Sequence, residues 1–63
     1  MQTIIRDTDG DETHRITLTG KTVVTEIHYH KRGWIEEYRE TAASSKQAAR
    51  WYAKEVAACE RAA

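Results

Sequence analysis

The sequence predicts an α+β domain: a four-stranded antiparallel meander followed by one C-terminal α-helix that packs on one face of the sheet. Two contrasting halves lead to this fold class. Residues 1 to about 41 contain short runs rich in β-branched residues, separated by short segments that each contain a Gly. This pattern is typical of strands joined by tight turns. Residues 44–63 carry apolar side chains at helical spacing and contain no Gly or Pro. We therefore expect strands over about 2–40 and a helix over about 45–62.

The first two strands are predicted from β-branched runs around two short turns. Thr3–Arg6 opens the first strand. Asp9-Gly10 follows and favours a type I′ turn, because both central residues of that turn need a positive φ. The second strand is His14–Thr19, and Gly20-Lys21 then forms a type II′ turn with Gly at the first central position.

The Gly20-Lys21 turn also predicts which residues pair across it. The pairs are Thr19 with Thr22, Leu18 with Val23, Ile16 with Thr25, Arg15 with Glu26, and His14 with Ile27. Apolar side chains then meet on one side of the hairpin, and opposite charges meet on the other side. Because two independent patterns agree, this register is the most strongly specified part of the fold.

The third strand continues through Glu26–His30, and Lys31-Arg32-Gly33 turns the chain into a fourth strand, Trp34–Arg39. Two registers fit this hairpin. One places Tyr29 opposite Ile35 and leaves the rings of the fourth strand on the open face.

The other register places Tyr29 opposite Trp34 and buries both Trp34 and Tyr38, with Glu36 near the edge of the core. We prefer this second register, because a core this small needs both aromatic rings.

The helix is predicted to start at Ser44, because Ser44-Ser45-Lys46-Gln47 has the spacing of a capping box. At 100° per residue, Ala48, Tyr52, Val56 and Cys59 share the face that packs on the sheet. The full predicted core is Ile5, Ile16, Leu18, Val23, Ile27, Tyr29, Trp34, Tyr38, Ala48, Tyr52, Val56 and Cys59. Such a core is small for a monomer, so a homodimer through the open sheet face or an edge strand is an alternative.

Composition limits the function classes. The 63 residues are expected to form a single domain (1–63), and its 10 basic and 10 acidic side chains give a net charge of zero. Neither a strongly basic nucleic-acid binder nor an acidic DNA mimic fits this balance. The single Cys59 cannot close an intramolecular disulfide, which fits a reducing cytoplasm. No apolar run approaches the roughly 20 residues of a membrane span, so we expect no membrane contact.

The sequence contains no convincing catalytic or metal site. His28 and His30 share one face of a strand near Glu26, but a structural zinc site needs four ligands. Cys59 falls on the core face of the helix, where a thiol is usually inert. We therefore expect a protein that is not an enzyme and has no cofactor.

Three groups of residues are candidates for partner binding. They are the loop Lys31 and Arg32 beside Trp34, the helix cations Lys46, Arg50 and Lys54 (with Arg61 on the same face), and the acidic turn Asp7, Asp9 and Asp11. The acidic turn lacks the spacing of a calcium loop. Each group has a plainer interpretation: a solvated outer helix face, an exposed turn, or a Trp that begins a core strand.

The segments Trp34–Arg39 and Ser45–Trp51 resemble the last strand and helix of arm-binding domains in phage-type integrases. That family reads the major groove of DNA with a three-stranded sheet. The resemblance implies Arg15, Lys31 and Arg32 as DNA contacts.

The chain as a whole, with its single Cys and an Ala-rich helix whose entry is Glu40–Ala48, is similar to small phage-encoded inhibitors, including the anti-CRISPR proteins. This resemblance implies a non-catalytic protein that blocks a nucleic-acid-handling complex of a bacterial host. The expected partner is a host protein or nucleoprotein complex in the cytoplasm, with DNA as the alternative partner.

Overall fold

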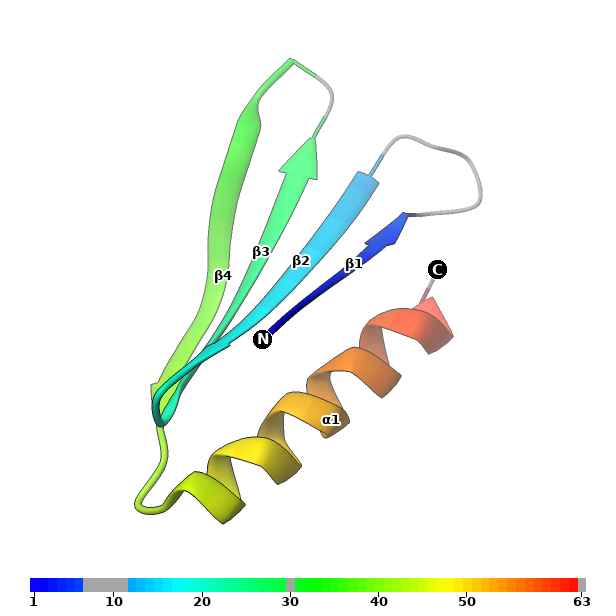
Figure 1. The fold of residues 1–63 in the computed structure, drawn as a ribbon. Helices are drawn as coiled ribbons and strands as arrows, with labels where there is room; N and C mark the ends of the chain where they lie inside the picture. The colour runs from blue at the N-terminus through cyan, green and yellow to red at the C-terminus, as the bar shows by residue number, and fades with distance from the viewer. Residues whose placement is uncertain (7–11, 30, 63) are drawn as a thin grey trace.

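The structure is a computed structural model that describes residues 1–6, 12–29 and 31–62 of the chain. It confirms the predicted α+β class, with an antiparallel sheet in the order β1-β2-β3-β4 and one helix on one face (Figure 1). The elements are β1 (Gln2–Arg6), β2 (Glu12–Thr19), β3 (Thr22–Tyr29), β4 (Gly33–Thr41) and α1 (Ser45–Ala62). The helix packs mainly on β2, with further contacts to β3 and β1, so the edge strand β4 is the most exposed strand of the sheet.

The β2–β3 hairpin has the predicted register at every one of the five pairs named above. Gly20 has φ = 60°, as the first central position of a type II′ turn requires. Ile16, Leu18, Val23 and Ile27 therefore point toward α1, and Arg15 and Glu26 point to the opposite face.

Strand β1 adds to this hairpin along β2, where Thr3 lies opposite Ile16 and Ile5 opposite His14. The hydroxyl of Thr3 also forms a hydrogen bond with the hydroxyl of Tyr52 on α1, which ties β1 to the helix. The predicted Asp9-Gly10 turn lies outside the described residues.

The preferred register of the β3–β4 hairpin holds from Thr22 opposite Thr41 to Thr25 opposite Tyr38, and it is wrong near the turn. Tyr29 lies opposite Gly33, rather than opposite Trp34 or Ile35. The turn closes earlier than expected, because Lys31 (φ = 72°) and Gly33 (φ = 77°) both adopt left-handed backbone conformations. As a result Trp34 leaves the predicted core: it lies on the face opposite α1 and is 40% exposed.

A β-bulge at Glu37 shifts the pairing of the second half of β4 by one residue. Glu26 pairs with Glu36 and Thr25 pairs with Tyr38, so Glu37 is an extra residue in β4. A bulge shifts the alternation of side chains by one position. Tyr38 consequently returns to the helix side and packs against the core, as predicted, although by a different route.

The core otherwise follows the sequence expectation. The predicted residues Ile16, Val23, Ile27, Ala48, Tyr52 and Cys59 are buried, and Ile5, Leu18, Val56 and Tyr38 pack against them. Tyr29 is half-buried. Two residues join the core without having been predicted there: Trp51, and Ala42, whose N–H donates a 2.8 Å hydrogen bond to the carbonyl of Lys21. That bond anchors the segment between β4 and α1 on the β2–β3 turn.

The helix begins with the predicted cap in a slightly different form. Ser44 Oγ accepts a 3.1 Å hydrogen bond from the N–H of Gln47. The side chain of Gln47 reaches back one residue further than in a standard capping box, and accepts from the N–H of Ala43 at 2.8 Å. In the part of the chain that the structure describes, no helix has the length and apolar character needed to cross a membrane.

Candidate functional site

The face of the sheet opposite α1, called here the open face, is the candidate site. Strand pairing places the following side chains on it: Gln2, Ile4, Arg6, Thr13, Arg15, Thr17, Thr19, Thr22, Val24, Glu26, His28, Trp34, Glu36, Arg39 and Thr41. The one helix of the described chain lies on the other side of the sheet, so this face has no covering layer (Figure 1).

Trp34 is the only large aromatic side chain on the described open face, and two neighbouring strands position it. The guanidinium carbon of Arg15, from β2, lies 4.0 Å from the centroid of the Trp34 ring. The imidazole of His28, from β3, meets the same ring edge-on, with 5.1 Å between centroids and an interplanar angle of 62°. A cation over an indole face is attracted by the ring quadrupole, so these contacts hold the ring in one orientation.

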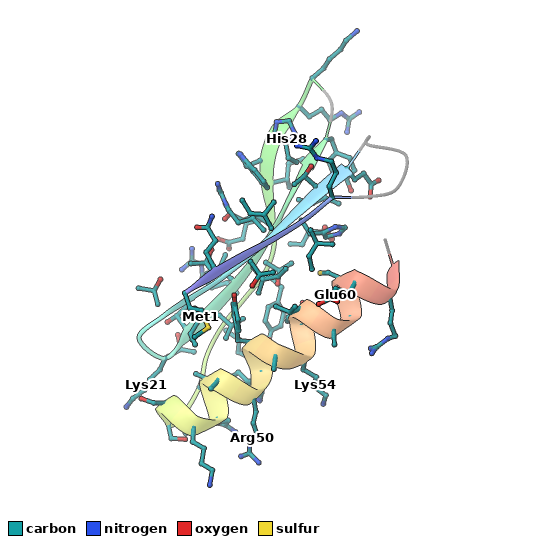
Figure 2. All side chains as sticks on the ribbon, turned by 45° about the vertical axis from the view of Figure 1, so that its right-hand side comes forward. Met1, Lys21, His28, Arg50, Lys54 and Glu60 are labelled. Atoms are coloured by element: carbon teal, nitrogen blue, oxygen red, sulfur yellow. The ribbon has the colours of Figure 1, made fainter. Side chains whose placement is uncertain are left out.

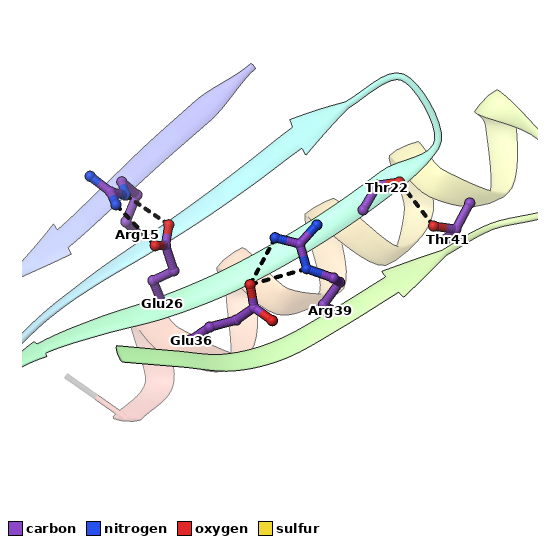
Figure 3. Close-up of polar contacts among 6 residues, drawn as sticks. All are labelled: Arg15, Thr22, Glu26, Glu36, Arg39 and Thr41. Atoms are coloured by element: carbon purple, nitrogen blue, oxygen red, sulfur yellow. Dashed lines mark hydrogen bonds and ion pairs between the residues drawn. The ribbon is translucent and has the colours of Figure 1, made fainter. Parts of the chain in front are cut away.

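Arg15 is itself held by Glu26. Its Nε and one terminal nitrogen donate hydrogen bonds to the two carboxylate oxygens of Glu26, each at 3.0 Å (Figure 3). These hydrogen bonds raise the pKa of Arg15 above its ordinary value. The fork geometry orients the guanidinium plane more tightly than a single contact would.

A second ion pair lies beside the first on the same face (Figure 3). Arg39 donates to Oε1 of Glu36 from Nε at 3.0 Å and from a terminal nitrogen at 2.8 Å. The hydrogen bonds from Arg39 lower the pKa of Glu36, and those to Glu36 raise the pKa of Arg39. The charges of both arginines are thus partly neutralised by carboxylates on the same face.

A shallow groove runs along the open face next to these ion pairs. It has a volume of about 410 Å³ and is lined by Thr17, Thr19, Thr22, Val24, Glu26 and Arg39. At its end the hydroxyls of Thr22 and Thr41 lie 2.9 Å apart (Figure 3). Short hydroxyl side chains, with one member of each ion pair, Glu26 and Arg39, leave room for a protruding loop or strand of a partner.

The structure distributes the predicted partner-binding residues over separate surfaces. Trp34 is on the open face, and Lys31 and Arg32 are exposed in the turn just before it. The helix cations Lys46, Arg50 and Lys54 are exposed, and Figure 2 shows Arg50 and Lys54 pointing away from the sheet. Asp7, Asp9 and Asp11 lie outside the described residues. The loop and the helix cations therefore cannot form one continuous contact surface, because the sheet and the helix core lie between them.

Sequence reasoning missed His28, Glu36 and Arg39 as members of the site. The sequence indicates His28 only as one of a pair with His30, either polar side chains on the open face or metal ligands, and the preferred register hid the pairing of Glu36 with Arg39. The adjacent Glu36-Glu37 pair inside an otherwise alternating strand was a usable signal, since one of two adjacent carboxylates would face the core without a bulge.

The residues considered as metal ligands or as a nucleophile are placed as follows. Among the described residues, no three His, Cys, Asp or Glu side chains gather closely enough to hold a metal ion. His30 lies outside the described residues, so its pairing with His28 remains a sequence hypothesis. Cys59 is buried, and desolvation, with added repulsion from Glu55 and Glu37, raises the pKa of its thiol. A protonated buried thiol is a poor nucleophile.

Comparison of the chain with protein families, with curated proteins and with solved structures gave no match.

Proposed function

We propose that the protein is a non-catalytic inhibitor that binds a protein component of a nucleic-acid-handling complex, in the manner of small phage-encoded inhibitors such as the anti-CRISPR proteins. The observation that carries the proposal is Trp34: a large ring, 40% exposed, fixed by Arg15 and His28 on an uncovered sheet face. Trp and Arg dominate the binding energy of protein interfaces when they lie in the centre of the contact. The proposed setting is the cytoplasm of a bacterial host.

The charges on the open face favour a protein partner over a phosphate backbone. Arg15 and Arg39 already pair with carboxylates of the same face, so each would have to give up a partner to bind phosphate. An oriented Trp beside arginines that are already paired instead suits a protein surface with an apolar pocket and a polar rim.

The partner is proposed to meet the open face and not the edge of β4. That edge carries a bulge at Glu37 and three further charged side chains: Glu36, Arg39 and Glu40. Bulges and charges are the devices by which edge strands avoid pairing with another strand. In the proposed contact Trp34 enters a pocket of the partner, and Lys31 and Arg32 reach acidic groups at the rim of the same face.

The test is an efficiency-of-plating assay in strains that each carry one active CRISPR system and are challenged with a targeted phage. Expression of the wild-type chain should restore plaque formation in at least one strain. Trp34→Ala should lose this effect. Ile35→Ala is the matched control, because Ile35 is the next residue of β4, is equally exposed at 40%, and points to the other face. Failure of the wild-type chain in every strain would remove the anti-CRISPR proposal.

DNA binding by the open face is the second candidate. It is favoured by one observation: Arg15, which the integrase resemblance implies as a DNA contact, lies on this face in contact with Trp34. Fluorescence anisotropy with a labelled duplex tests it. DNA binding that Trp34→Ala and Arg15→Ala both weaken, and that Ile35→Ala leaves unchanged, would support this candidate over the inhibitor.

A further inference from the structure

The outer face of α1 carries a row of cations that the open face does not explain. This row, called here the helix stripe, consists of Lys46, Arg50, Lys54 and Arg61, all exposed. Figure 2 shows Arg50 and Lys54 on the side of the helix away from the sheet. No position three or four residues before or after any of the four holds Asp or Glu.

The helix stripe is unfavourable for the helix that carries it. Lys46, Arg50 and Lys54 follow one another at intervals of four residues, and like charges at this interval repel on a helix surface. The first turn of α1 has no acidic residue, so Lys46 also faces the positive end of the helix dipole. A stripe that served only as a solvated surface would be expected to alternate Lys with Glu.

The described part of the chain does not neutralise the stripe. Its ion pairs are Arg15 with Glu26 and Arg39 with Glu36, and both belong to the open face. The chain as a whole is neutral, so the stripe reflects a separation of charge and not a general excess of basic residues. A polyanion outside the protein would relieve the repulsion within the stripe.

We propose that the helix stripe binds the phosphate backbone of a nucleic acid. Successive cations at four-residue intervals are about 6 Å apart along the helix axis, and Lys46 to Arg61 spans about 22 Å. Phosphates of one strand of B-DNA follow at about 3.4 Å along the duplex axis, so the stripe spans about six of them and can neutralise four. Only small side chains, Ala53 and Ala57, lie between the cations, which allows a backbone to approach closely but offers no anchor for a protein pocket.

This inference goes beyond the proposed inhibitor. The open face and the helix stripe lie on opposite sides of the molecule, so a protein partner and a nucleic acid can be bound together. A chain that contacts both components of a nucleoprotein complex would discriminate the assembled complex from its free protein.

The test is anisotropy of a labelled 20-base-pair duplex of random sequence at about 50 mM and about 200 mM salt, with the full chain. Four phosphate contacts predict a slope of log affinity against log salt of about −3.6, or about a 150-fold loss over this range. The double variant R50E/K54E should bring the slope to about −1.8 or abolish binding. The matched control K31E/R32E makes the same change in net charge on another surface and should leave the slope near the wild-type value.

A second readout separates binding from folding. Arg50→Glu places a carboxylate between Lys46 and Lys54, so it should raise the melting temperature of the free protein while it weakens DNA binding. Three results would overturn the inference: no binding of wild type at about 50 mM salt, equal loss in R50E/K54E and K31E/R32E, or loss in Trp34→Ala with R50E/K54E unaffected. The plating assay with Trp34→Ala remains a separate test of the inhibitor.

Discussion

Glu36 and Arg39 form an ion pair on one face of β4 although they lie three residues apart in the chain. In a regular strand, residues three apart point to opposite faces. The bulge at Glu37 removes this conflict, and it also lets Trp34 face outward while Tyr38 faces α1. The candidate site and one side of the core therefore depend on a single extra residue.

Deleting Glu37 should lower the melting temperature and abolish the proposed inhibition, because a regular β4 cannot keep both Trp34 on the open face and Tyr38 in the core. Circular dichroism on heating and the plating assay measure the two effects. Glu37→Ala keeps the length of the strand, so it should retain both the bulge and the activity. Equal behaviour of the deletion and of wild type would contradict this role for the bulge.

Ile16→Ala should destabilise the protein by about 2–5 kcal/mol, because Ile16 is fully buried under the helix. A domain of this size has a total stability of only about 3–9 kcal/mol, so this loss removes a large share of it. Urea unfolding gives the free-energy difference. Ile4→Ala is the control: Ile4 is on the open face and is 56% exposed, so its removal should change stability by less than about 0.5 kcal/mol. A loss under about 1 kcal/mol for Ile16→Ala would contradict the described core.

Tyr38 should make stability depend on alkaline pH. Its hydroxyl donates a 2.7 Å hydrogen bond to Glu40. That bond, desolvation and the charges of Glu40 and Glu55 raise the pKa of Tyr38 from 10.0 to about 12. Because the folded pKa exceeds the unfolded one, the contribution of the neutral phenol is fully present below pH 10 and is lost as the pH rises through about 12.

Urea unfolding at a series of pH values from about 9 to about 12 checks this dependence, and Tyr38→Phe should show a shallower decline than wild type. Parallel declines for the two proteins would mean that Tyr38 titrates without a raised pKa in the folded state.

Lys31→Gly should stabilise the protein by about 0.5–1 kcal/mol. Lys31 has φ = 72°, and a left-handed conformation costs an L-residue about 1–2 kcal/mol. Gly avoids this cost, but it loses more backbone entropy on folding, so only part of the gain remains. Thermal melting measures the gain. The neighbouring Arg32→Gly relieves no positive φ and should be neutral or destabilising. A loss of stability in Lys31→Gly would contradict the turn conformation.

The sequence was sufficient for the β2–β3 hairpin because turn chemistry and two cross-strand patterns act on the same residues. The sequence was insufficient for β4. There, the expectation that Trp34 and Tyr38 are both buried led to a register without a bulge. The Glu36-Glu37 pair indicates that β4 is irregular, but contacts with other parts of the fold decide where the extra residue lies: Arg15 and His28 against Trp34, and the core against Tyr38. Trp34 was identified as a candidate anchor, but its burial was predicted wrongly for the same reason.

The most direct measurement is the affinity of purified Trp34→Ala and Ile35→Ala for the effector complex of the CRISPR system that responds in the plating assay. A central interface anchor contributes about 2 kcal/mol or more, so Trp34→Ala should bind about 30-fold or more weakly than wild type. Ile35→Ala should stay within about threefold of wild type. Equal affinities for the two variants, or a larger loss for Ile35→Ala, would contradict a binding site on the open face.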